Sequence, residues 1–186
     1  TVTSAMTGEG KTTTALSLAI QFAQAGKRTL LIEADLRKPS LHRILNLDNQ
    51  VGLTNYLVGG GAQPVDIAKP THIPNLFAIP SGPLPPNPVD LLSSARMVEL
   101  LSLAAGKFDQ VILDSPPLLG LADALIIGNL CEGTLLTVEM GSTPRGYARG
   151  ALKRLHGGRV HVLGAILTKL EARAGAYGYY RSYYYY

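Results

Sequence analysis

Apolar residues along this chain follow two patterns, short continuous runs and longer stretches with helical spacing. Counted from residues 1–4, which resemble the last part of a strand, the runs have the length of buried β-strands and continue at residues 29–32, 76–79, 110–114, 134–138 and 162–167. The helical stretches cover residues 15–23, 41–45, 89–105, 121–130 and 144–155. Gly26 marks the end of the first helix, and five prolines between residues 80 and 88 mark a stiff loop.

Strands that alternate with helices predict an α/β fold with a largely parallel sheet. Ligands of such sheets bind at the carboxyl ends of the strands. Glu33 and Asp35 follow the second apolar run, and Asp114 ends the fourth. We therefore expect these three acids at one edge of the sheet. Because a strand already begins at residue 1, we also expect the sequence to be part of a longer protein.

The aromatic residues are distributed unevenly. The chain has 186 residues, enough for one domain, and 46% of them are hydrophobic, enough for a sizeable core. Seven of the nine tyrosines lie in the last ten residues, so the core must be aliphatic. This contrast predicts a domain over residues 1–171 and a separate, flexible, tyrosine-rich tail over residues 172–186.

Composition excludes several kinds of site. Cys131 is the only cysteine, which excludes an intrachain disulfide and a cysteine-based zinc site, and the four histidines lack metal-ligand spacing. The most apolar stretch, residues 118–138, is interrupted by acids and glycines, which is not typical of a membrane span. The net charge of +4 is spread without a basic run, so we expect no nucleic-acid partner.

The strongest motif is the glycine-rich segment at residues 8–13, between the first strand and the first helix. Gly10, Lys11 and Thr12 supply the end of the P-loop pattern, and Ala5 stands at its first glycine. Backbone N–H groups of such a loop face phosphate oxygens, Lys11 would reach the β- and γ-phosphates, and the Thr12 hydroxyl would ligate Mg²⁺. The predicted nucleotide-binding residues are Thr7, Gly8, Glu9, Gly10, Lys11, Thr12 and Thr13.

Two further segments support a nucleotide site. Residues 33–39, of sequence Glu-Ala-Asp-Leu-Arg-Lys-Pro, place two acids and two bases directly after a strand, an arrangement that suits metal and phosphate. Asp114 ends a hydrophobic strand about 100 residues after the P-loop, which is the Walker B arrangement for Mg²⁺.

Together with the terminal tyrosine cluster, these three motifs resemble the bacterial tyrosine kinases of exopolysaccharide and capsule synthesis, a deviant-Walker P-loop family. The resemblance implies a P-loop NTPase fold and an ATP-dependent protein-tyrosine kinase, with Mg²⁺ held by Thr12, Asp35 and Asp114. It implies that Glu33 activates the attacking tyrosine hydroxyl and that Lys11 and Arg37 offset the charge of the transferring phosphoryl group. The family usually has Asp at the position of Glu33.

The resemblance also implies the substrate and the partners. One subunit's tail would enter the site of its neighbour in a ring, and the phosphate acceptors would be Tyr177, Tyr179, Tyr180, Tyr183, Tyr184, Tyr185 and Tyr186. Further implied partners are a membrane-spanning polysaccharide co-polymerase module, fused or separate, and a phosphotyrosine phosphatase. The expected location is the cytoplasm, at the inner face of the cell membrane, where the kinase would regulate exopolysaccharide polymerisation and export.

Three alternatives stay open at this point. A cell-division or partition ATPase would share the Walker motifs, although such proteins typically carry lysine at the position of Met6 and lack a tyrosine tail. A targeting GTPase is suggested by Thr168-Lys169, although Glu171 stands where Asp would bind guanine. A non-catalytic, nucleotide-gated scaffold of the kinase fold is suggested by Glu33.

Overall fold

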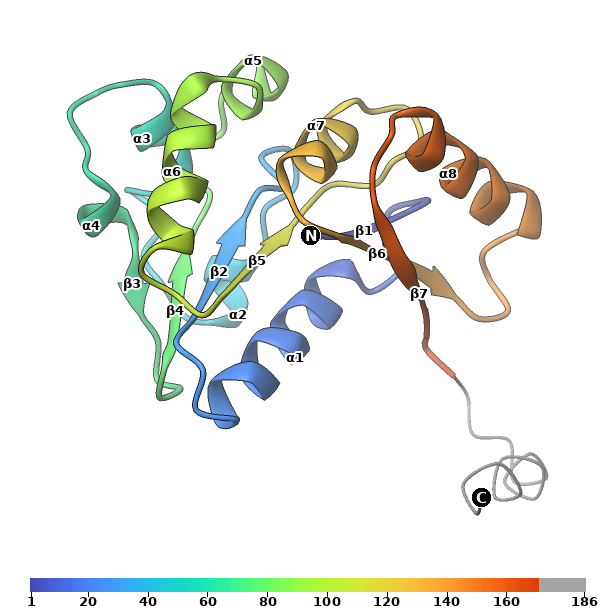
Figure 1. The fold of residues 1–186 in the computed structure, drawn as a ribbon, viewed down its shortest axis with the longest axis horizontal. Helices are drawn as coiled ribbons and strands as arrows, with labels where there is room; N and C mark the ends of the chain where they lie inside the picture. The colour runs from blue at the N-terminus through green and yellow to red at the C-terminus, as the bar shows by residue number, and fades with distance from the viewer. Residues whose placement is uncertain (171–186) are drawn as a thin grey trace.

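The computed structural model describes residues 1–170, which form a central sheet with helices on both faces (Figure 1). The strands are β1 (Val2–Ser4), β2 (Thr29–Glu33), β3 (Lys69–Pro70), β4 (Leu76–Ile79), β5 (Gln110–Asp114), β6 (Thr134–Glu139) and β7 (Val162–Thr168). The helices are α1 (Lys11–Gln24), α2 (Leu41–Ile44), α3 (Leu53–Leu57), α4 (Pro64–Ile67), α5 (Pro88–Leu92), α6 (Ala95–Ala105), α7 (Asp123–Leu130) and α8 (Arg145–Gly157). The predicted tail over residues 172–186 lies outside the described residues.

The sheet has the strand order β3-β4-β2-β5-β1-β6-β7. Every pairing is parallel except that of β3 with β4, so the prediction of a largely parallel α/β sheet is confirmed. In the register of β2 and β5, Glu33 pairs with Asp114. The expected convergence of these two strand-end acids at one edge of the sheet is therefore confirmed.

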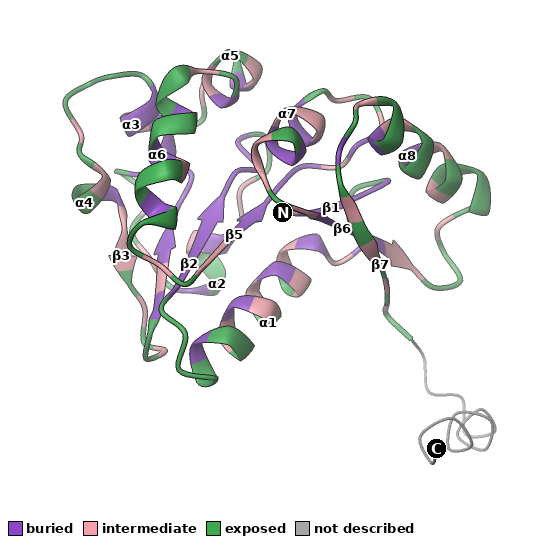
Figure 2. Ribbon diagram, viewed as in Figure 1, coloured by how far each residue is buried: buried purple, intermediate pink, exposed green. Residues whose placement is uncertain are grey.

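Alternation along the strands divides the core between the two faces of the sheet. Leu30 and Ile32 of β2 pack with residues of α6 and α7, whereas Leu31 packs with the alanines of α1. Figure 2 shows β1 and β2 buried along their whole length, while most exposed residues lie on the outer sides of the helices and on the loops. The core is aliphatic, as the scarcity of aromatic residues in the body of the chain predicts.

The structure corrects the sequence-based prediction between β2 and β5. The helix predicted over residues 89–105 is two helices, because Ser94 caps α6 by accepting a bond from Met97 N, and this ends α5 before it. The elements α3, α4 and β3 were not predicted, since each is five residues or shorter and too brief for a periodic pattern.

The beginning of α3 lies against the loop that follows β4. Leu53 N donates to Pro80 O at 2.8 Å, and Thr54 N donates to Ser81 O at 2.9 Å. Gly52 permits this approach, since a Cβ at this position would stand 2.3 Å from Pro80 O and 2.4 Å from Gly82 N. The close contact holds the loop after β4 beside the carboxyl edge of the sheet.

We expect Gly52→Ala to destabilise the domain by about 2–3 kcal/mol, because both clashing atoms belong to the backbone and cannot rotate away. Urea unfolding would measure the change. Gly60→Ala is the matched control, since its Cβ would meet only Asn55 O at 3.9 Å. Equal midpoints for the two variants would contradict the packing described for α3.

Candidate active site

The glycine-rich loop between β1 and α1 is shaped for an anion. Gly8 and Gly10 have φ angles of +89° and +82°, which L side chains rarely adopt, so glycine is required to curl the backbone here. No side chain caps the first turn of α1, and no acidic residue lies in it. Its N–H groups and the helix dipole therefore favour a phosphate at this end.

The side chains of the loop divide into buried and exposed groups. Lys11 is buried at the start of α1, Thr12 is half-buried, and Thr7 and Thr13 are exposed. A buried lysine beside free helix N–H groups brings the positive charge that the sequence predicts for the β- and γ-phosphates. The structure thus brings the predicted nucleotide-binding residues together at one helix end.

Glu9 fixes the shape of the loop. Its side chain is only 2% exposed, and its carboxylate accepts hydrogen bonds from Met6 N at 2.7 Å and from the Thr143 hydroxyl. The Thr168 hydroxyl donates to Glu9 O at 2.9 Å. The phosphate loop is therefore held by the segment between β6 and α8 and by the last residue of β7, two contacts that sequence reasoning missed.

Thr12 and Asp114 meet across the carboxyl edge of the sheet. Thr12 Oγ1 donates to Asp114 Oδ2 at 2.6 Å, although 102 residues separate the two. Asp114 is 1% exposed, and its Oδ1 is buried without a hydrogen-bond partner among the described residues. Burial raises the pKa of Asp114 to about 7, although the bond from Thr12 and the charge of Lys11 oppose the rise.

The Asp114 oxygen without a hydrogen-bond partner could ligate a divalent cation that lies beside a phosphate. Hydroxyl and carboxylate oxygens are the donors that Mg²⁺ prefers, and Mg²⁺ commonly takes its remaining ligands from water and phosphate. Within residues 1–170, no group of three or more His, Cys, Asp or Glu side chains could ligate a metal. The residues present therefore fit a cation that arrives with a nucleotide better than a cage made by the protein alone.

The two acids of the segment after β2 are used differently. Asp35 is 8% exposed, and its Oδ1 accepts bonds from Arg37 N at 3.2 Å and Lys38 N at 3.0 Å. Its negative charge contributes to the raised pKa of Asp114, which places it in the same electrostatic site. Asp35 thus keeps some access to solvent close to the Thr12–Asp114 pair.

Glu33 is fully buried and bound to backbone donors. Its Oε1 accepts bonds from Ser40 N and from Leu41 N, the latter at 2.6 Å, and its Oε2 accepts from Ser81 N at 3.4 Å. His42 Nδ1 lies 3.6 Å from Oε2. In this arrangement Glu33 joins the start of α2 to the end of β4, and its role as the catalytic base stays a prediction.

Arg37 is held by a partner that sequence reasoning missed. Its Nε and Nη2 donate to the two carboxylate oxygens of Asp123, at 2.8 Å and 3.1 Å. Asp123 is fully buried in the first turn of α7, and the bond to it raises the pKa of Arg37. The available signal was Asp123, one of two acids in the apolar stretch 118–138, since a buried carboxylate needs a cation. Arg37 is thus oriented in advance at this edge of the sheet.

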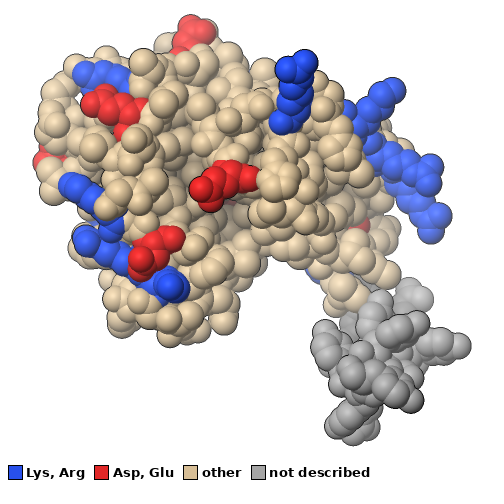
Figure 3. Space-filling model, in the orientation of Figure 1, with Lys and Arg blue, Asp and Glu red and all other residues tan. Residues whose placement is uncertain are grey.

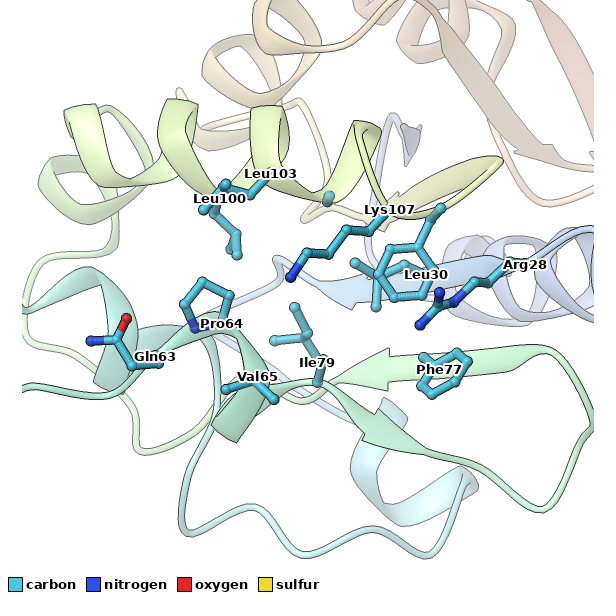
Figure 4. Close-up of a pocket in the computed structure, with 13 residues that line it drawn as sticks. Arg28, Leu30, Gln63, Pro64, Val65, Phe77, Ile79, Leu100, Leu103 and Lys107 are labelled. Atoms are coloured by element: carbon cyan, nitrogen blue, oxygen red, sulfur yellow. The ribbon is translucent and has the colours of Figure 1, made fainter.

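A separate hollow of about 430 Å³ lies at the opposite end of the strands. Leu30, Ile79 and Leu100 are among its lining residues, and Lys107 reaches over it (Figure 4). The Arg28 guanidinium lies 5.3 Å from the ring centre of Phe77 and 5.0 Å from that of Phe108. This hollow begins at the amino ends of β2 and β5 and takes no part in the phosphate site.

Comparison with known proteins agrees with this geometry. Residues 1–131 match a protein family described as an AAA domain. The chain is 45% identical to the tyrosine-protein kinase YwqD of Bacillus subtilis over 182 residues, which cover 96% of this chain and 76% of that protein. The chain belongs to the bacterial tyrosine-protein kinases. The kinase domain of the Escherichia coli tyrosine kinase ETK superposes with a TM-score of 0.89 at 33% identity, covering 94% of this chain and 68% of that one.

The family assignment settles the fold and the general class of the protein. The Pyrococcus horikoshii septum site-determining protein MinD, solved with Mg-ADP, shares the fold with a TM-score of 0.75 at 23% identity, covering 89% of this chain and 68% of that one. The similarity to YwqD and to the ETK kinase domain confirms the resemblance to bacterial tyrosine-protein kinases. In residues 1–170, no helix has the length and apolar character that crossing a membrane requires.

We expect Asp114→Asn to stabilise the metal-free domain at pH 8 and to have little effect at pH 4.5. The pKa of Asp114 rises from 3.8 in the reference state to about 7 in the fold, so stability falls as the pH increases between these values. The substitution removes this loss, which amounts to roughly 2–4 kcal/mol above pH 7. Denaturant unfolding in EDTA at both pH values measures it, and an effect independent of pH would contradict the burial of an ionised Asp114.

Proposed function

We propose that this chain is an ATP-dependent tyrosine autokinase whose substrate is its own terminal tyrosine cluster. The observation that carries the proposal is the Thr12–Asp114 pair beneath the phosphate loop, with one buried carboxylate oxygen left for a nucleotide-bound cation. A second observation supports the choice of substrate. The last residue of β7, Thr168, bonds to the phosphate loop, and only three residues of the sequence separate it from the tail at residue 172.

The proposed chemistry is an in-line transfer of the γ-phosphoryl group. The tyrosine oxygen forms a bond to the γ-phosphorus as the bond from that phosphorus to the β,γ-bridging oxygen breaks, and ADP leaves. Lys11 and the first turn of α1 stabilise negative charge on the phosphate oxygens. Thr12 and Asp114 would hold Mg²⁺, which when bound would neutralise charge on the β- and γ-phosphates.

The phenol proton needs an acceptor, because a free tyrosine has a pKa near 10. We assign this role to Asp35, which is buried but whose Oδ2 accepts no hydrogen bond from the described residues, in preference to Glu33, whose two carboxylate oxygens accept three backbone bonds. The Arg37–Asp123 pair would then orient a cation beside the transferring group without moving during the reaction.

The cellular setting of the activity is part of the same proposal. The tail of one subunit would enter the site of its neighbour in a ring-like assembly, next to a membrane-spanning polysaccharide co-polymerase module, fused or separate. The kinase would lie at the inner face of the membrane, and a phosphotyrosine phosphatase would reverse the modification. Modification would regulate exopolysaccharide polymerisation and export.

One observation favours a second candidate function. Glu33 stands at the position of the family's usual base. Its carboxylate, however, accepts backbone bonds that hold the start of α2 to the segment after β4. A nucleotide-gated scaffold that binds ATP without phosphorylating tyrosine would fit this arrangement.

We expect the purified chain to acquire phosphotyrosine when mixed with ATP and Mg²⁺, and mass spectrometry to place it between Tyr177 and Tyr186. Lys11→Met should reduce the modification at least about 100-fold, since it removes the buried charge beside the phosphates. Lys27→Met, at an exposed position after α1, is the control. Nucleotide binding without any phosphotyrosine would favour the scaffold.

We expect Asp35→Asn to slow autophosphorylation at least about 100-fold and Glu33→Gln to slow it less than about tenfold. Glutamine keeps an oxygen for Ser40 N and Leu41 N, whereas asparagine at position 35 removes the charge near Asp114. Initial rates at saturating ATP would separate the two. If Glu33→Gln lowered the autophosphorylation rate as much as Asp35→Asn, the role of the base would belong to Glu33 instead.

A further inference from the structure

The outward face of α8 carries a row of cations. Arg145, Arg149 and Lys153 are four residues apart and exposed, and His156 is exposed on the same face. The opposite face packs into the core through Ala151 and Leu155. Figure 3 shows the blue side chains gathered over this end of the molecule.

No anion in the helix or its flanking segments neutralises this row. The sequence has no Asp or Glu between Glu139 and Glu171, while six Lys or Arg residues lie in that interval. In the described part of the chain, Arg145, Arg149 and Lys153 take part in no ion pair. The row therefore presents unneutralised positive charge to solvent.

Glycines lie beside the cations on the same face. Gly146 and Gly150 each follow a cation of the row, and Gly157 lies further along the same side of the helix. A Cβ added at any of the three would meet nothing within 4 Å. Glycine weakens an exposed helix interior relative to alanine, and neither packing nor backbone geometry requires it here. The glycines leave helix backbone uncovered next to the charges, so a second chain can approach closely.

We propose that this face of α8 binds the tail of the chain once its tyrosines are phosphorylated, an inference that rests on the proposed autokinase activity. Each phosphotyrosine carries about −1.5 to −2 charge and three acceptor oxygens. Cations four residues apart on a helix are about 6 Å apart along its axis. Alternate residues of an extended chain, such as Tyr184 and Tyr186, are separated by about 6.6 Å, so the two rows match in spacing.

The tail can reach this face from its own domain. Met140 N donates to Thr168 O at 3.1 Å, so the chain leaves β7 beside the segment that leads into α8. Tyr177 follows Thr168 by nine residues, enough to span about 30 Å when extended. The 13 residues of α8 extend over about 20 Å. All seven predicted acceptors are thus within reach of the row.

Phosphotyrosine fits this face better than an anionic membrane does. Helices that bind membranes in their plane bury a broad apolar face in the lipid. On α8 the outward face carries the cations and His156, with Leu152 as one exposed apolar residue among them, and Tyr147 is exposed at the side of the helix. Ala151 and Leu155 are buried in the core. The surface offers charge and backbone access, and its two exposed apolar residues, Tyr147 and Leu152, do not make a broad apolar face.

The test measures binding of a synthetic peptide of residues 173–186, phosphorylated at its tyrosines, to the full chain carrying Lys11→Met. This variant cannot modify its own tail if the proposed activity is correct, and the phosphates come from synthesis, so the result does not depend on autophosphorylation. We expect the phosphorylated peptide to bind at least about 30-fold more tightly than the unphosphorylated one, with affinity falling as salt increases.

Two sets of substitutions locate the site. Changing Arg145, Arg149 and Lys153 together to Gln should weaken binding at least about 30-fold, while the control that changes the exposed Lys27, Arg43 and Lys107 to Gln, with the same loss of charge, should weaken it less than about threefold. Gly146→Leu with Gly150→Leu keeps the charges but covers the backbone, and it should weaken binding about tenfold with unchanged helical content.

The inference is overturned if the α8 and control variants bind the phosphorylated peptide equally. It is also overturned if the unphosphorylated peptide binds as tightly, or if phosphatidylserine vesicles bind through α8 and the phosphorylated peptide does not. A chain that shows no autophosphorylation but binds the peptide through α8 would contradict the proposed function alone.

Discussion

The hydrogen bond from Thr12 to Asp114 is the contact on which the rest of the site depends. It requires β1 and β5 to be neighbours, so that the helix after one strand faces the acid at the end of the other. It also leaves one Asp114 oxygen buried and without a partner among the described residues. Burial raises the pKa of this carboxyl group and so disfavours its ionised form. The buried, ionised carboxylate destabilises the metal-free fold, and a cation bound with a phosphate at this point would offset that destabilisation.

Around this contact, several acidic residues hold neighbouring segments and side chains in place. Glu9 holds the phosphate loop to Thr143, Glu33 holds α2 to the end of β4, and Asp123 holds Arg37. Such bonds restrict motion at the carboxyl edge of the sheet, which favours a site whose charges are in place before the substrate arrives. They also mean that removing one of these acids would disturb structure as well as charge.

The end of β7 links the site to the remainder of the chain. Thr168 bonds to the phosphate loop, while Met140 and Lys169 tie the end of β6 to the end of β7. The described chain therefore ends next to residues that contact the phosphate loop and to the end of β6. In these proposals the phosphate site would act on the unphosphorylated tail, and the cation row of α8 would bind the phosphorylated tail. One domain would then use two surfaces, one for the substrate and one for the product.

The sequence alone determined the α/β class, the strand-end positions of Glu33 and Asp114, and the phosphate loop, because hydrophobic periodicity and glycine-rich turns are local properties. Family membership followed from the same motifs. The tertiary structure decided how the two acids at the end of β2 are bonded. Both carboxylates are buried, yet Glu33 accepts backbone bonds on both oxygens and Asp35 on only one. The Arg37–Asp123 pair spans 86 residues, and the row on α8 becomes a surface only once Ala151 and Leu155 turn it outward. Such outcomes depend on contacts between distant segments, which no local pattern encodes.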